Sequence, residues 1–213
     1  MRTVSAGGAP YAVVKRLFDI AFSLVALAIA FIPAIILCLI IRLESPGFPI
    51  YVQKRMGRMR PDGTLTTFPM FKFRSMYRDA DQRLDSLLAQ NEIAGPMFKM
   101  HDDPRVTKVG RFIRKHSIDE VPQFINVLAG HMSVVGPRPP LPREVAEYTR
   151  RDMQRLRVRP GLTGYWQISG RSDLDFDEMI DLDLRYIEEA SIMTDLRVVF
   201  KSVKVVLMGD GAY

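Results

Sequence analysis

Two adjacent carboxylates, Asp119 and Glu120, are the side chains of this sequence best placed to do chemistry. They stand at the expected start of a helix, where backbone N–H groups and the positive end of the helix dipole favour anions. A carboxylate kept ionised there could attack phosphorus as a nucleophile, or hold a divalent metal that bridges to phosphate. A structural reading stays open, because Ser117-x-x-Glu120 is also the pattern of a capping box, in which the acid stabilises the first turn.

Basic side chains at three further places are suited to an anionic ligand. Arg138 lies between prolines, so it is presented from a rigid stretch and loses little entropy when its guanidinium binds phosphate. Lys72 and Arg74 alternate along an expected strand and share one face of it. Arg159 and Arg171 flank a glycine-rich loop. Each place also has a structural interpretation. Arg138 could lie in a proline-rich bend, Lys72 and Arg74 could guard an edge strand by their charge, and the glycine-rich loop could be a turn with Trp166 in the core.

The elements that position these residues follow from apolar spacing and turn signals. Strands at 50–55 and 65–73 enclose a turn-rich stretch and predict a β-hairpin. The last helix has a basic face formed by Arg197, Lys201 and Lys204, which is typical of an interfacial amphipathic helix lying along anionic headgroups. Helices are also expected after residue 79, from about 119 to 130, weakly over 144–157, over 176–190 and over 195–208, whereas 91–117 look irregular.

The N-terminal part of the chain carries a long apolar segment. No charged residue occurs from Ile20 to Ile41, a run long enough for a bilayer-spanning helix and too long for a signal peptide. Pro33 removes a backbone donor in the middle of the run and predicts a kink there. Both flanks are basic, so the positive-inside rule gives no direction. On these residues alone, a re-entrant hairpin and a kinked spanning helix are equal alternatives.

Composition excludes several classes of protein. Of the 213 residues 47% are hydrophobic and 25% charged, which excludes a disordered chain. A single cysteine excludes an intrachain disulfide, and one cysteine with three histidines are too few for a zinc cluster. The net charge is +6, although acids crowd 173–190 in what we interpret as a solvated helix face. The remaining basic surface favours nucleic acid, phospholipid or a phosphorylated substrate, and no nucleic-acid-binding motif supports the first.

Six motifs follow one another along the chain. They occur at 72–76, 103–105, 117–123, 126–128, 132–139 and 159–164. Together and in this order they resemble those of bacterial sugar transferases, the monotopic phosphoglycosyl transferases that begin polysaccharide and glycoconjugate assembly. The resemblance extends over nearly the whole chain.

The resemblance implies a reaction and a place for it. A sugar 1-phosphate would pass from a UDP-sugar to polyprenol (undecaprenyl) phosphate, with magnesium and with release of UMP. Residues 1–48 would form the re-entrant membrane helix. Residues 49–213 would form a catalytic domain, mostly α with a small β-hairpin, on the cytoplasmic face of the bacterial inner membrane beside anionic lipids.

The resemblance also implies roles for individual residues. Asp119 matches the family's nucleophile and metal ligand, and Glu120 its partner carboxylate. Substrate-binding positions of the family match Lys72, Arg105, Arg114, Arg138, Arg159 and Asp195.

Other functions remain open at the level of sequence. A non-catalytic scaffold could bind lipid through the same basic surface, and a glycosyltransferase would release UDP in place of UMP. The identity of the UDP-sugar and the formation of a homo-oligomer are likewise open.

Overall fold

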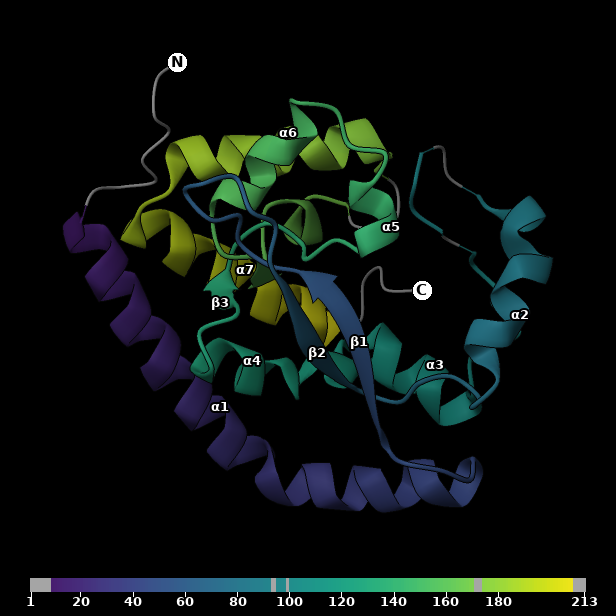
Figure 1. The fold of residues 1–213 in the computed structure, drawn as a ribbon. Coiled ribbons are helices and arrows are strands. Elements are labelled where there is room, and N and C mark those ends of the chain that lie inside the picture. Colours follow the sequence, from purple (N-terminus) through teal and green to yellow (C-terminus); the bar gives the residue numbers. More distant parts are fainter. Residues whose placement is uncertain (1–8, 93–94, 99, 171–173, 209–213) are drawn as a thin grey trace.

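A long bent helix, α1 (Ala9–Glu44), runs along one side of the computed structural model of this chain (Figure 1). The structure describes residues 9–92, 95–98, 100–170 and 174–208. Helix α1 is long and apolar enough to cross a membrane. Its two halves run in clearly different directions in Figure 1, and Pro33 lies inside the helix. A proline inside a helix removes one hydrogen bond and crowds the preceding turn, so the kink expected from the sequence agrees with the bend.

The N-terminal half of α1 is fastened to the body of the molecule by two charged side chains. The Arg16 guanidinium donates to the backbone carbonyl of Val127, at a distance of 2.7 Å. The carboxylate of Asp19 is buried and accepts from the backbone N–H of Val134 at 2.9 Å. Val127 belongs to helix α4 (Gln123–Leu128), and Val134 belongs to strand β3 (Ser133–Val135).

The C-terminal half of α1 is fastened to helix α3 (Lys108–Lys115). The Glu44 carboxylate accepts from the backbone N–H groups of Lys108 and Val109, at 2.8 and 3.2 Å, and so caps that helix. Ile41 is buried beside Phe73 and Ile113 in a small apolar cluster. Both halves of α1 therefore contact the same body.

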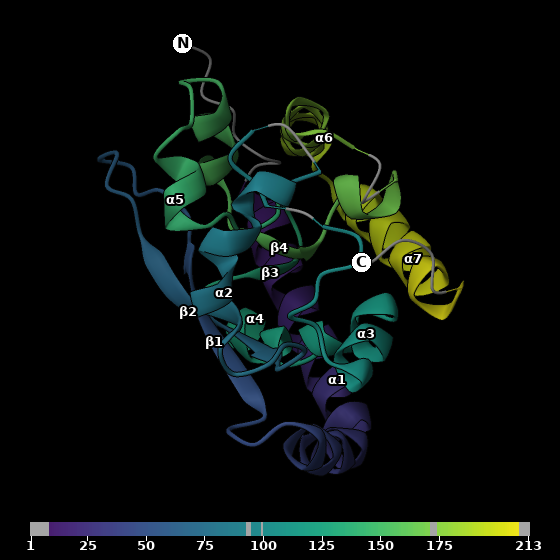
Figure 2. The same ribbon diagram turned by 90° about the vertical axis from the view of Figure 1, so that its right-hand side faces the viewer.

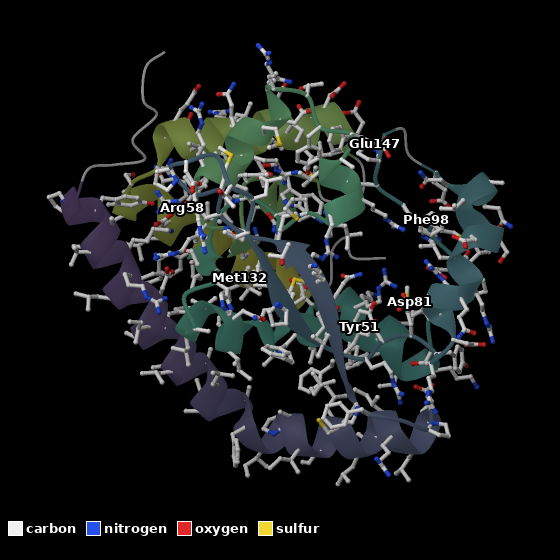
Figure 3. The ribbon with its side chains drawn as sticks, in the orientation of Figure 1. Tyr51, Arg58, Asp81, Phe98, Met132 and Glu147 are labelled. Carbon is white, nitrogen blue, oxygen red and sulfur yellow. The ribbon has the colours of Figure 1, made fainter. Side chains whose placement is uncertain are left out.

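The predicted hairpin is present, as strands β1 (Ile50–Met56) and β2 (Thr67–Phe73). The strands pair antiparallel, with Tyr51 opposite Lys72 and Arg55 opposite Phe68. Because directly opposed residues share a face, Arg55 and Lys72 lie on the same side of the hairpin. A hydrogen bond from the Tyr51 hydroxyl to Asp81, 3.2 Å long, joins this hairpin to helix α2 (Ala80–Leu87) (Figure 3).

Two expectations for the middle of the chain are wrong. Residues 91–117 include helix α3, which the Thr107 side chain caps by accepting from Gly110 at 2.9 Å. The helix expected over 144–157 is interrupted between α5 (Pro142–Val145) and a 3-10 helix, Asp152–Arg157. The arginines of this segment do not share one solvated face, because Arg155 turns inward and pairs with Asp183.

The last two helices have the expected positions but not all the expected faces. Helix α6 (Phe176–Glu189) buries Asp183 against Arg155, so its acids do not all lie on a solvated face. Helix α7 (Ile192–Met208) buries Val198 and Val199, whereas Phe200 is 74% exposed. The apolar side chains of this helix are therefore divided between the core and the surface. Figure 2 shows the β1–β2 hairpin and α7 on opposite sides of the molecule.

A second small sheet was not expected. Strand β3 pairs in parallel with β4 (Gly161–Thr163). The two backbone segments approach closely at Gly136, which follows β3, since a Cβ atom on Gly161 would lie 2.1 Å from the Gly136 nitrogen. The largest apolar core joins β2, α4, β3, α6 and α7 through Phe68, Met70, Val127, Met132, Val134, Val135, Tyr186, Ile187, Val198 and Val199. Met132 is labelled in Figure 3.

Candidate active site

The carboxylates of Asp119 and Glu120 meet the ammonium group of Lys72. Lys72 Nζ lies 2.7 Å from Glu120 Oε1 and 3.5 Å from Asp119 Oδ2. Strand β2 supplies the lysine, and a 3-10 helix, Ile118–Glu120, supplies the acids. One ammonium group therefore faces two carboxyl groups.

The backbone before the acids rules out the capping box that the sequence allowed. Ser117 has φ of 53°, in the left-handed region, and its side chain forms no cap hydrogen bond. A left-handed serine is strained, and strain of this kind is commonly held at functional sites. The α-helix begins only at Gln123, preceded by Pro122. Asp119 therefore lies in a short turn before α4, not in the first turn of that helix.

Asp119 is buried, with 6% of its surface exposed. Burial raises the pKa of its carboxyl group above the ordinary value, and nearby Glu120 adds to the rise, while Lys72 and Arg114 oppose it. The sequence argument that a helix N-terminus would favour the anion names the wrong cause. Lys72 and Arg114 are the groups that favour ionisation here.

A cavity of about 610 Å³ opens beside these acids. Its wall combines residues from the hairpin, the turn before α4, the loop after β3 and helix α7. Among the residues singled out from the sequence, those that line it are Lys72, Arg105, Arg114, Asp119, Glu120 and Arg138. Most of the predicted site is therefore brought together around one space large enough for a small-molecule substrate.

Arg138 reaches this cavity from the proline-rich loop after β3. Its Nη1 atom donates to Glu144 Oε2 at 3.1 Å, and the same carboxylate oxygen accepts from the backbone N–H of Leu141 at 2.7 Å. Burial opposes ionisation of Glu144, but the Arg138 and Arg55 guanidinium groups and the Leu141 N–H lower its pKa below the ordinary value. Glu144 is thus a fixed anion that orients Arg138 from behind the cavity wall.

Arg105 lines the cavity but is already paired. Its guanidinium binds Asp103 through two atoms, with Nη2 2.6 Å from Oδ2 and Nε 2.9 Å from Oδ1. It also lies over the ring of Phe98, 5.0 Å from the centroid, at the place labelled in Figure 3. The positive charge of Arg105 is therefore largely balanced within the protein.

Three predicted residues, Arg74, Asp195 and Arg159, do not line the cavity. Arg74 is buried after β2 and donates to the backbone carbonyls of Ser45 and Pro46. Asp195 is buried between Lys15, whose Nζ lies 2.7 Å from Oδ2, and the Tyr186 hydroxyl, 2.7 Å from Oδ1. It thereby ties α7 to α1. Arg159 precedes β4, where burial and the nearby guanidinium groups of Arg16 and Arg58 lower its pKa. Arg171 lies outside the described residues.

One residue of the cavity wall, Arg55, was not singled out from the sequence, and another, Trp166, was left between two interpretations. Arg55 is buried on β1, and the strand alternation that places it on the same face as Lys72 could have indicated it. Trp166, in a 3-10 helix spanning Trp166–Ile168, lines the cavity, and its Nε1 atom is buried without a hydrogen-bond partner. The sequence placed Trp166 either in a ligand loop or in the core, and it stands at the boundary between the two.

The acids at the cavity fit magnesium only in part. Mg²⁺ in proteins commonly takes one or two carboxylates and completes its shell with water and substrate phosphates. Asp119 and Glu120 supply that number. In the part of the chain that the structure describes, no group of three or more His, Cys, Asp or Glu side chains is placed to hold a metal by itself. The donor set therefore suits a cation that enters with a phosphate.

A family model described as bacterial sugar transferase matches residues 10–209. Among similar proteins, a galactosyl transferase of Streptococcus agalactiae serotype III is 48% identical over 94% of this chain and 43% of its own length. An undecaprenyl-phosphate galactose phosphotransferase of Salmonella typhimurium is 44% identical over 93% of this chain and 41% of its own length. The chain thus spans about two fifths of the length of these two relatives.

A shorter relative matches almost from end to end. An exopolysaccharide production protein of Sinorhizobium fredii is 38% identical over 93% of this chain and 88% of its own length. The residues that the family model matches, 10–209, include all of helix α1 but its first residue, the hairpin and every residue that lines the cavity.

Proposed function

This chain belongs to the bacterial sugar transferase family, and from that premise we propose that it transfers a sugar 1-phosphate from a UDP-sugar to polyprenol (undecaprenyl) phosphate with release of UMP. The observation that carries the proposal is the Lys72–Asp119–Glu120 group, set in a cavity that Arg114 and Arg138 also line. Names of two relatives support the lipid acceptor, since they contain undecaprenyl phosphate and a phosphotransferase activity.

Asp119 is the nucleophile of the proposed reaction. A carboxylate oxygen of Asp119 forms a bond to the phosphorus that bears the sugar, and the bond from that phosphorus to the bridging oxygen of UMP breaks. An oxygen of polyprenol phosphate then attacks the same phosphorus and frees the Asp119 carboxylate. The lipid product carries a diphosphate and the sugar. Lys72 lies between Asp119 and Glu120 and opposes the rise that burial causes in the pKa of Asp119.

Glu120 and the arginines complete the assignment. Glu120 is more exposed than Asp119, with side-chain exposures of 34% and 9%, so it is available to orient or deprotonate the incoming lipid phosphate. Arg114 and Arg138 stabilise the charge of the diphosphate. Asp119 and Glu120 would hold Mg²⁺ together with substrate phosphates, and the cation would supply further neutralisation of that charge.

The site belongs at a membrane surface in this proposal. Helix α1 is fastened to the body near both of its ends, which supports a re-entrant path that returns to the cytoplasmic face of the inner membrane. Helix α7 exposes Met193 and Phe200, with Arg197 and Lys201 exposed on the same helix. Apolar and basic side chains together favour the interface of an anionic leaflet. A long lipid phosphate and a soluble nucleotide sugar can meet there.

The covalent step is tested by mass. The full chain in detergent, incubated with a panel of UDP-sugars without lipid, should gain the mass of one phospho-sugar with its own substrate. Asp119→Asn should lose both the adduct and turnover, by about a thousandfold or more, because an amide is a poor nucleophile. Brisk UMP release with lipid but no adduct without it, together with intersecting initial-rate lines, would mean direct transfer. Release of UDP would indicate a glycosyltransferase.

A further inference from the structure

The cavity wall holds a buried arginine, Arg55, that the reaction as proposed does not use. Arg55 lies on β1 with 8% of its surface exposed. Its Nη1 atom donates to the backbone carbonyl of Pro139 at 2.9 Å. Its Nε and Nη2 atoms donate to Gln53 Oε1 at 3.0 and 2.6 Å. These bonds hold the guanidinium plane against the proline-rich loop that carries Arg138.

The hydrogen bonds of Arg55 leave donors for a ligand. An arginine has five N–H groups in a rigid fork. The three bonds within the protein use one N–H on each nitrogen, so Nη1 and Nη2 each keep a second N–H. Both partners of Arg55 are neutral oxygens, so neither balances its charge. Arg55 lines the cavity, so a guanidinium group without a hydrogen-bonded carboxylate stands at the ligand space.

Arg55 and Arg138 together concentrate positive charge at one end of the cavity. Both line it, whereas Glu144, the carboxylate paired with Arg138, does not. Burial and the charge of Arg138 lower the pKa of Arg55 to about 9. The carboxylates of Glu144 and Glu120 oppose this fall, but neither accepts a hydrogen bond from Arg55. An anion in the cavity could bond directly to both guanidinium groups and would be their closest countercharge.

The hairpin separates this end from the acids. Lys72, which contacts Asp119 and Glu120, lies on β2 opposite Tyr51, whereas Arg55 lies four residues further along β1 from Tyr51, on the same face. The hairpin face thus presents two cations to one cavity at two separate places. A ligand with two linked phosphates could use both, one phosphate at each.

We propose that Arg55 binds the phosphate of the leaving nucleotide, as the second arm of a paired guanidinium clamp with Arg138. This inference rests on the proposed function and adds a binding residue to it. Lys72 and Asp119 engage the phosphate that stays with the sugar, and the clamp engages the phosphate that departs with uridine. Arginine is suited to this task because its planar fork binds phosphate oxygens in pairs.

Direct binding of uridine and UMP tests the clamp without reference to turnover. The full chain in detergent is titrated with each ligand by calorimetry. The ratio of the Kd for uridine to the Kd for UMP is then compared between variants. Wild type should bind UMP more tightly than uridine. In Arg55→Gln the ratio should fall about tenfold or more, because a charge-assisted hydrogen bond to phosphate is lost while contacts to uridine remain. Arg55→Lys keeps the charge without the fork and should give a smaller fall.

A matched control separates binding from support of the fold. Lys54 directly precedes Arg55 on β1 and is exposed on the opposite face of the hairpin, outside the cavity. Lys54→Gln should therefore leave the ratio unchanged. A purely supporting Arg55 would weaken uridine and UMP equally when replaced, and that result overturns the proposal. If Arg55→Gln does not fold, an unchanged ratio in Arg55→Lys overturns the proposal as well. If the ratio falls in Arg55→Gln but the wild-type protein transfers no sugar phosphate, the result would contradict the proposed function and leave the clamp in place.

Discussion

At the scale of single residues, Lys72 is the cation that the two acids share. Burial and the neighbouring Glu120 raise the pKa of Asp119, and a protonated carboxyl group is a poor nucleophile. The ammonium group of Lys72, 2.7 Å from Glu120 and 3.5 Å from Asp119, opposes that rise. In the proposed reaction the more buried acid attacks, and the more exposed acid meets the second substrate.

Arg138 permits a prediction about geometry as opposed to charge. Arg138→Lys keeps the positive charge but cannot form a fork onto phosphate while bound to Glu144. We expect kcat/KM for the UDP-sugar to fall about 10- to 100-fold, as for loss of a charge-assisted hydrogen bond. Arg143→Lys, an exposed change in the same segment and outside the cavity, is the control and should be silent. Full activity in Arg138→Lys would show that charge alone suffices.

Residue types and spacing predicted the acids but not all of their surroundings. Asp119 and Glu120 stood out because paired carboxylates before a helix are a chemical pattern in themselves. Lys72 could be assigned to a strand, but its contact with acids 47 and 48 residues away depends on tertiary packing. The contact of Asp195 with Lys15, 180 residues away, likewise depends on tertiary packing, and no local pattern indicates it.

At the scale of elements, helix α3 carries Arg114 to the cavity wall. The helix packs so closely on the chain after β2 that a Cβ atom on Gly110 would lie 1.9 Å from the backbone oxygen of Ser75. Glu44 and Thr107 cap its first turn from two directions. These contacts are backbone to backbone or to fixed side chains, so α3 has little freedom to shift.

Gly110→Ala is expected to destabilise the protein by about 2 kcal/mol or more, because neither backbone can yield without breaking the contact. Thermal unfolding of the detergent-solubilised chain measures this as a lower Tm. The control is Lys108→Ala, an exposed change on the same helix, which should alter Tm little. A Gly110→Ala variant as stable as wild type would mean that α3 and residue 75 are less tightly apposed than described.

Elements with a long apolar repeat were predicted well, whereas short elements were missed. The hairpin, α6 and α7 were expected from alternation and from helical spacing, and all three are present. Helix α3 was missed because it has only eight residues, too few for its periodicity to stand out, and because its caps come partly from Glu44, in a distant element. The β3–β4 pair was missed because each strand has only three residues.

At the scale of the whole molecule, the path of α1 decides where the site stands relative to a bilayer. In the re-entrant proposal, both ends of the helix face the cytoplasm. Cys38→Ala removes the only cysteine, and single cysteines can then be placed at Ala12 and Phe48, both exposed. Phe48 is preferable to Gly47, which has φ of +128° and lies against Arg74.

Both cysteines should resist a membrane-impermeant thiol reagent in intact cells and react once the cells are permeabilised, which serves as the control. Labelling of one position but not the other in intact cells would mean that α1 spans the membrane. Pro33→Ala should shift the pattern in that direction, because a straight helix restores the hydrogen bond that the proline removes.

The two attachments of α1, at Arg16 with Asp19 and at Glu44, have a mechanical consequence. A body held to its anchor at one point can swivel, whereas a body held at two separated points loses that freedom. In the re-entrant proposal, the height and tilt of the cavity above the lipid would therefore be set by the fold and not by a linker. A lipid phosphate lying at one depth would then always meet the same opening.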